Sequence, residues 1–264
     1  MQSSLMGLGF LSPRFRGGVH DAWSDDFPIR HEVFAEDRLR EHAASLATSH
    51  EVVPRGVSHH AVLGRVRNNY RLMKEAYAEL MASSASGGTI TPAAEWLVDN
   101  FYTAELHIHQ IIEDLPSGYF RQLPKLAKGH LAGYPRVMAI AWAYIAHTDS
   151  HFDKATLAEF TNAYQEVSQL TIGELWALAI HLRILLIENA TRIACRTVVS
   201  RRARDAADAM AQEFSVRHVP PSEVRAAIAG LVDHARLSFA VQLISRLRVQ
   251  PNVSAEAIAD LRDV

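Results

Sequence analysis

The chain has 264 residues, of which 48% are hydrophobic and 21% are charged, and its formal net charge is −2. This composition is that of a globular protein with a sizeable core, and it excludes an intrinsically disordered chain. The small net charge gives no global attraction to nucleic acid. The single cysteine, Cys195, excludes an internal disulfide framework and fits a reducing compartment.

The N-terminal residues 1–27 show only weak periodicity and contain Ser, Gly and Arg. They lack the order of charged, apolar and small residues that marks a secretory signal. We expect a disordered tail there, or a start codon assigned too early. No membrane span is predicted, because the longest apolar run, residues 137–146, is half of the roughly 20 residues that a spanning helix needs.

Helical periodicity begins at Pro28. Apolar residues recur at helical spacing over residues 34–46 and again from His59 to Met81. A Ser- and Gly-rich stretch, residues 83–88, then predicts a flexible break.

The next helix has a clear predicted start. Thr91 is expected to cap it, with Pro92 at the first helical position, where the missing N–H costs nothing. Its periodicity continues to Asp114. Prolines and glycines make the following stretch irregular, and Pro135 is expected to start a helix that ends near Ala146.

A long helix is the main predicted element. Asp153 is expected to cap the helix that precedes it, over residues 154–167. Thr171 and Glu174 have the spacing of a capping box, in which each side chain bonds the other residue's free backbone N–H. No proline follows until Pro220, so the helix is expected to run for about ten turns. We expect Trp176 in its buried face, where truncation to alanine would cost about 3–5 kcal/mol.

The C-terminal part is expected to hold two more helices. One spans Ser222 to about Arg248, after Pro220 and Pro221 end the long helix. The other is capped by Ser254 and is cut short at Val264.

The predicted fold is therefore all-α: an irregular bundle or array of about seven or eight helices around one long central helix. Alternating apolar and polar runs are absent, which argues against a strand ladder. We expect residues 28–264 to form the helical domain, with residues 84–89 as the place where it would divide.

No constellation of reactive residues is visible in the sequence. His147 and His151 are four apart with Asp149 nearby, but they straddle an expected loop and no HExxH motif is present. There is no P-loop, GxGxxG, GxSxG or DxD motif, and Cys195 is expected to be a small buried apolar residue. We therefore predict no catalytic, cofactor-binding or metal-binding residue.

One basic patch remains as a candidate interaction surface. It consists of Arg196, Arg201, Arg202 and Arg204 in the second half of the long helix. These arginines are expected either to pair with nearby acids such as Asp205 on a solvated face, or to contact anionic lipid or an acidic partner.

Five blocks of the sequence resemble the N-terminal region of the cyclic β-1,2-glucan synthases, and the resemblance runs from about Pro28 to the end of the chain. The blocks are residues 90–102, 114–126, 131–136, 147–150 and 170–189.

This resemblance implies part of a membrane-associated glycosyltransferase of carbohydrate metabolism. Proteins that this chain resembles look like multi-activity enzymes. They combine a UDP-glucose-dependent glucosyltransferase, a cyclising domain and a phosphorylase-like domain. All of these lie beyond the end of this chain, so no catalytic residue of the family carries over. The resemblance implies a non-catalytic cytoplasmic region at the inner membrane, whose partners are the catalytic domains of the same synthase and an anionic membrane surface.

Two further hypotheses stay open at this point. The first is a free-standing helical interaction module without enzymatic activity. The second is an independent small hydrolase or metal enzyme, which is weakened because no convergent site is visible. The end of the chain at Val264, inside an expected helix, favours a fragment of a synthase.

Overall fold

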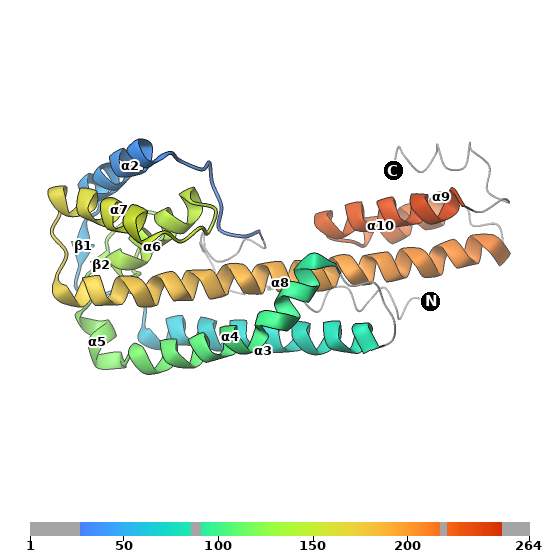
Figure 1. Ribbon diagram of the computed structural model, residues 1–264, viewed down its shortest axis with the longest axis horizontal. Coiled ribbons are helices and arrows are strands. Elements are labelled where there is room, and N and C mark those ends of the chain that lie inside the picture. Colours follow the sequence, from blue (N-terminus) through green and yellow to red (C-terminus); the bar gives the residue numbers. More distant parts are fainter. Residues whose placement is uncertain (1–26, 86–90, 217–220, 250–264) are drawn as a thin grey trace. The chain divides into compact units, whose positions relative to one another are not determined.

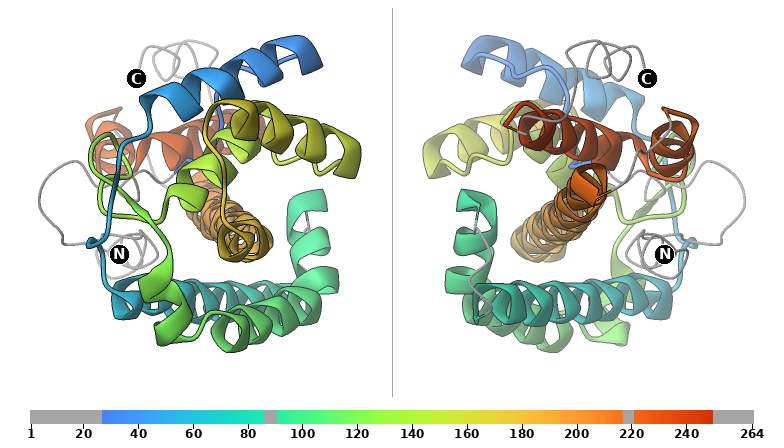
Figure 2. Two further views of the ribbon diagram at one scale, coloured as in Figure 1. Left: turned by 90° about the vertical axis from the view of Figure 1, so that its left-hand side faces the viewer. Right: turned by 90° about the vertical axis from the view of Figure 1, so that its right-hand side faces the viewer.

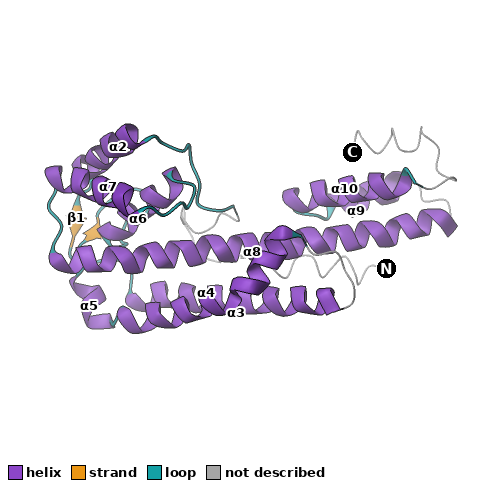
Figure 3. Cartoon of the chain, viewed as in Figure 1, coloured by secondary structure: helices purple, strands orange, loops and turns teal. Residues whose placement is uncertain are grey.

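The computed structural model describes residues 27–85, 91–216 and 221–249. The predicted tail, apart from Phe27, and the predicted Ser254 helix lie outside these residues. Within them the chain forms nine helices and one small two-stranded sheet, which confirms the predicted all-α fold (Figure 3). The helices are α2 (Glu36–Ser49), α3 (His59–Ala85), α4 (Pro92–Asp114), α5 (Ser117–Gln122), α6 (Arg136–His147), α7 (Lys154–Val167), α8 (Ile172–Val216), α9 (Pro221–Ala229) and α10 (Asp233–Leu247).

The described residues divide into two compact units. Residues 27–77 and 96–193 form the larger unit, and residues 78–85, 91–95, 194–216 and 221–249 form the smaller unit. The helices α3, α4 and α8 each contribute residues to both units.

In the larger unit, α8 lies between two helical layers. The helices α3 and α4 lie on one side of it, and α2, α6 and α7 lie on the other (Figures 1 and 2). The helix α2 packs against both α6 and α7. Nearly all of α6 is buried, from Arg136 to Ala146, so this helix forms the centre of the second layer.

In the smaller unit, α10 packs beside the C-terminal half of α8. Asp208 of α8 accepts hydrogen bonds from Gln242 Nε2 at 2.7 Å and from Arg246 Nε at 2.8 Å. Apolar side chains of α10, including Phe239 and Leu243, are buried.

Local sequence signals set the starts of α4, α7 and α8 as predicted. The Asp153 carboxylate accepts a hydrogen bond from Thr156 N at 2.7 Å, and the Thr91 hydroxyl accepts one from Ala94 N at 3.3 Å. The capping box is also confirmed: Thr171 N donates to Glu174 Oε2 at 3.0 Å, and Glu174 N donates to Thr171 Oγ1 at 3.2 Å. The proline-free stretch after it is a single helix of 45 residues.

Two predictions about local structure are wrong. The helix expected over residues 222–248 is two helices, because Gly230 and an extended Val232 separate α9 from α10. A minor sheet was also missed, in which β1 (Val52–Val53) pairs antiparallel with β2 (Lys125–Leu126). Strands of two residues are too short to show an alternating pattern, so only the packing of distant segments reveals them.

None of the helices in the described ranges is long and apolar enough to cross a membrane.

A close backbone approach fixes the loop between β1 and α3. Val57 N donates to Gly133 O at 2.8 Å, and a Cβ built on Gly56 would lie 2.1 Å from that same carbonyl oxygen. Only glycine leaves room for this approach, because a side chain would collide with backbone that cannot rotate away.

We therefore expect Gly56→Ala to lower the free energy of unfolding by about 1–3 kcal/mol through overpacking, measured by urea denaturation. Gly64→Ala is the matched control, since Gly64 is exposed within α3 and its Cβ would meet nothing within 4 Å. That control should gain roughly 0.5–1 kcal/mol from better helix propensity. Equal effects of the two substitutions would contradict the steric explanation.

Candidate functional site

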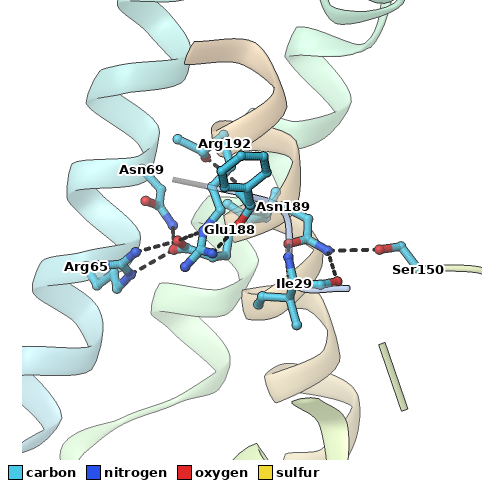
Figure 4. Close-up of polar contacts among 10 residues, drawn as sticks. Ile29, Arg65, Asn69, Ser150, Glu188, Asn189 and Arg192 are labelled. Atoms are coloured by element: carbon cyan, nitrogen blue, oxygen red, sulfur yellow. Dashed lines mark hydrogen bonds and ion pairs between the residues drawn. The ribbon is translucent and has the colours of Figure 1, made fainter. Parts of the chain in front are cut away.

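The most concentrated polar site in the larger unit surrounds Glu188 of α8, whose side chain is 2% exposed. Its carboxylate accepts hydrogen bonds from Arg65 Nε and Asn69 Nδ2, both at 2.8 Å, and from Arg192 Nε at 2.7 Å (Figure 4). Arg65 Nη2 donates to the second carboxylate oxygen, so the arginine binds in a bidentate manner. Glu188 thereby joins α8 to α3.

The next residue, Asn189, holds the N-terminal segment in place. Its Oδ1 accepts a hydrogen bond from Ile29 N at 2.6 Å, and its Nδ2 donates to Ser150 Oγ at 2.9 Å and to Ile29 O at 3.3 Å. Arg192 Nη1 donates to Phe27 O. One turn of α8 thus binds residues 27–29 and the loop after α6 (Figure 4).

A second buried ion pair fixes the start of α8. Arg136, the first residue of α6, donates from Nε and Nη2 to the two carboxylate oxygens of Glu174, each at 2.8 Å. Its Nη1 also donates to Ser168 Oγ at 2.9 Å. Glu174 therefore serves both as the capping-box residue of α8 and as the partner of a buried arginine.

These buried ionic groups are suited to holding helices together and poorly suited to proton transfer. Burial by itself raises the pKa of Glu188, but hydrogen bonds and charges from Arg65, Arg192 and Asn69 outweigh it and lower the pKa below its ordinary value. The carboxylate therefore stays ionised at neutral pH. His181 is fully buried, its Nδ1 donates to Ala177 O at 2.7 Å, and burial lowers its pKa to about 4.

The predicted arginine surface lies in the smaller unit, and Glu79 of α3 binds two of its members. Arg201 Nη2 and Arg202 Nε both donate to Glu79 Oε1, at 2.7 Å and 2.8 Å. Arg201 also pairs with Asp205 at 2.8 Å. The other two, Arg196 and Arg204, are half-buried. Whether this patch meets a partner stays a prediction.

The exposed face of α8 corrects one expectation. Trp176 is not in the core, because 73% of its surface is exposed. Ile172 is 71% exposed and Leu175 is 37% exposed, and all three residues lie on one face of the first two turns of α8. We call these three residues the apolar stripe. The helical periodicity of the sequence shows which residues share this face of α8. It does not show whether another helix covers the face, and among the described residues none does.

A cavity of about 530 Å³ in the larger unit is lined by histidines. One side of the cavity is formed by Ala139, Trp142, Ala143 and Ala146 of α6. The three alanine side chains are small and fill little of the space. Five imidazole rings surround it: those of His31, His42, His50, His130 and His147.

The histidines of this cavity are mostly held by other protein groups. His147 Nδ1 lies 2.7 Å from Glu32 O, and its ring stacks on Phe34 at a centroid distance of 3.9 Å. Burial is the largest cause of the lowered pKa of His50, about 4, and of the lowered pKa of His42. Their rings are therefore neutral at pH 7.

His147 and His151 do not form the metal pair considered from their spacing. His147 faces Phe34, His151 is exposed, and Asp149 instead pairs with Arg30 at 3.0 Å. Across the residues that the structure describes, no three His, Cys, Asp or Glu side chains are grouped so as to hold a metal ion.

Sequence reasoning found Glu188 and Arg192 as polar residues of the long helix but missed their partners. Their spacing of four residues is that of a helical ion pair, which was a usable signal. Arg65, Asn69 and Arg136 gave no signal, because their contacts depend on which helices become neighbours.

Removing the central carboxylate should be costly. We expect Glu188→Ala to lower the free energy of unfolding by about 3–5 kcal/mol, because two arginines lose their buried counter-charge. Its lowered pKa means that this stabilisation is complete above pH 4.5, the ordinary value, and is lost as the pH falls through the folded-state pKa. Urea denaturation across the acid range measures both effects.

Glu75→Ala is the control for that substitution, since the Arg71–Glu75 pair is largely exposed and should contribute less than about 0.5 kcal/mol. A similar loss in both variants would show that the network around Glu188 adds no special stability.

Truncating Trp176 should have little effect on stability. With most of the indole in solvent, Trp176→Ala should change the free energy of unfolding by less than about 0.5 kcal/mol. Phe160→Ala, at a fully buried position of α7, should cost about 3–5 kcal/mol in the same denaturation experiment. A large loss for Trp176→Ala would place the indole in a packed environment.

Comparison with known proteins finds one informative similarity. Over 235 residues the chain is 37% identical to the cyclic beta-(1,2)-glucan synthase NdvB of Rhizobium meliloti (strain 1021). The match covers 88% of this chain but only 8% of that protein, and no family model matches. The resemblance predicted from the sequence is thereby confirmed, and the chain is similar to one region of a much larger cyclic β-1,2-glucan synthase.

Proposed function

We propose that this chain is a non-catalytic scaffolding region of a cyclic β-1,2-glucan synthase. Similarity over most of the chain to a synthase more than ten times as long as the matched part supports this assignment. On this proposal the synthase reaction belongs to other parts of the protein, and the helical region positions them. We place it at the cytoplasmic face of the bacterial inner membrane.

The observation that carries the scaffolding role is the way α8 divides its residues. The polar side chains of Glu174, Glu188 and Asn189 point inward and are used in internal contacts. The apolar stripe points outward into solvent. Exposed large apolar side chains grouped on one face are typical of interaction surfaces, and tryptophan is enriched among the residues that dominate binding energy.

The proposed partner of the stripe is the remainder of the synthase. We leave the arginine surface out of this contact, because Arg201 and Arg202 already pair with Glu79. An anionic membrane surface remains a second proposed partner for the residues of that patch.

The docking proposal can be tested with separate polypeptides. The tagged chain is co-expressed with R. meliloti NdvB from which the matching region has been deleted, and retention of the large fragment is quantified. We expect Ile172→Glu with Trp176→Glu to reduce retention at least tenfold, because two charges replace the apolar contact. Circular dichroism and denaturation confirm that the variant folds.

Phe152→Glu is the matched control, since Phe152 is 55% exposed in the same unit but lies outside the stripe. It should leave retention unchanged. Absence of retention by the unmodified chain would contradict the scaffolding role and favour a free-standing interaction module. Equal losses in both variants would contradict the assignment of the contact to α8.

A further inference from the structure

A second cavity in the larger unit, of about 580 Å³, is lined by basic and hydroxyl residues together with apolar ones such as Phe120. It lies where the loop after β1 meets the start of α3, the helix α5 and the first residue of β2. Its lining comes from residues 54–60 together with Ser117, Phe120, Arg121 and Lys125.

The lining carries positive charge without any compensating acid. Arg55, Arg121 and Lys125 are cationic, His59 and His60 are adjacent, and no Asp or Glu is among the lining residues. Within the described part of the chain, Arg55 and Arg121 make no ion pair, although the arginines around Glu188 and Glu79 are all paired. Such an uncompensated cluster favours an anionic ligand.

Hydrogen bonds to backbone carbonyl groups hold the ammonium group of Lys125 at the wall of the cavity. Its side chain is buried, and its Nζ donates to the carbonyl oxygens of Phe120 and Leu123 and, at 3.3 Å, to that of Arg121. Burial lowers the pKa of Lys125. Because its donors are already used, Lys125 contributes electrostatic potential to the cavity, while the two arginines remain available to bind.

The backbone adds to the same preference. The 27-residue helix α3 begins at His59 with no acidic residue in its first turn, so the partial positive charge of its N-terminus is not offset there. His59 Nε2 donates to Leu115 O at 2.6 Å, which leaves the buried Nδ1 without a hydrogen-bond partner.

The wall of the cavity is held in place before any ligand arrives. The pairing of Val53 with Lys125 places the loop that carries Arg55 next to β2. The contact of Gly56 and Val57 with Gly133 then fixes that loop. A preformed wall reduces the entropy that binding would otherwise cost.

We propose that this cavity binds a phosphate-type oxyanion through Arg55 and Arg121. The guanidinium group matches phosphate oxygens in a bidentate geometry, and the cavity volume suits a small phosphorylated molecule or a phospholipid headgroup. The phosphate group is the feature recognised in both cases. This property is separate from the scaffolding role, since none of the residues lining the cavity belongs to the apolar stripe.

Isothermal titration of the full chain with pyrophosphate tests the site directly. We expect saturable binding that weakens with added salt, and Arg55→Ala with Arg121→Ala should weaken it at least tenfold through loss of charge-assisted hydrogen bonds. Arg40→Ala with Arg67→Ala is the charge-matched control, because both arginines are exposed in the same unit and outside the cavity. Circular dichroism should show that both double variants keep the fold.

Vesicle sedimentation separates the two sources of phosphate. Binding to phosphatidylglycerol vesicles but not to phosphatidylcholine vesicles, with competition by pyrophosphate and loss in the Arg55/Arg121 variant, would support a lipid headgroup. Binding of pyrophosphate without vesicle binding would support a soluble ligand. If the unmodified chain binds neither at millimolar concentration, or if both double variants lose binding equally, the cavity is not an oxyanion site.

Discussion

The larger unit depends on one buried carboxylate, that of Glu188. Removing a carboxylate from water costs several kcal/mol unless charge and hydrogen bonds replace the lost hydration. Arg192 supplies them from the next turn of α8, whereas Arg65 and Asn69 lie on α3 and can do so only if α3 and α8 keep their register. The adjacent Asn189 adds two hydrogen bonds to the backbone of Ile29. One turn of α8 therefore fixes both α3 and the segment that precedes α2.

This arrangement gives α8 an unusual division of polar and apolar residues. Glu174 and Glu188 are buried and bind arginines of neighbouring helices, whereas the apolar stripe lies in solvent. Buried ion pairs favour a specific geometry more than they add stability, and an exposed tryptophan favours association. Together these features support the proposed scaffolding role.

The basic cavity is a second candidate site in the same unit, and no residue of α8 lines it. It results from the meeting of two short segments, which the pairing of β1 with β2 brings together. The arginine patch predicted from the sequence differs from this cavity, because Glu79 pairs with two of its arginines, Arg201 and Arg202. Positive charge therefore marks a binding site only where the fold leaves it uncompensated.

The sequence by itself determined the helical fold and the starts of helices such as α7 and α8, because caps such as Asp153 and the Thr171–Glu174 box act within four residues of the backbone they satisfy. The sequence was also sufficient to find the similarity to the cyclic β-1,2-glucan synthases. Only the tertiary structure decided that Trp176 is exposed and that Glu188 is buried, since periodicity defines a face of a helix but not what covers it. The same holds for the basic cavity, whose two segments are about sixty residues apart and meet only through packing.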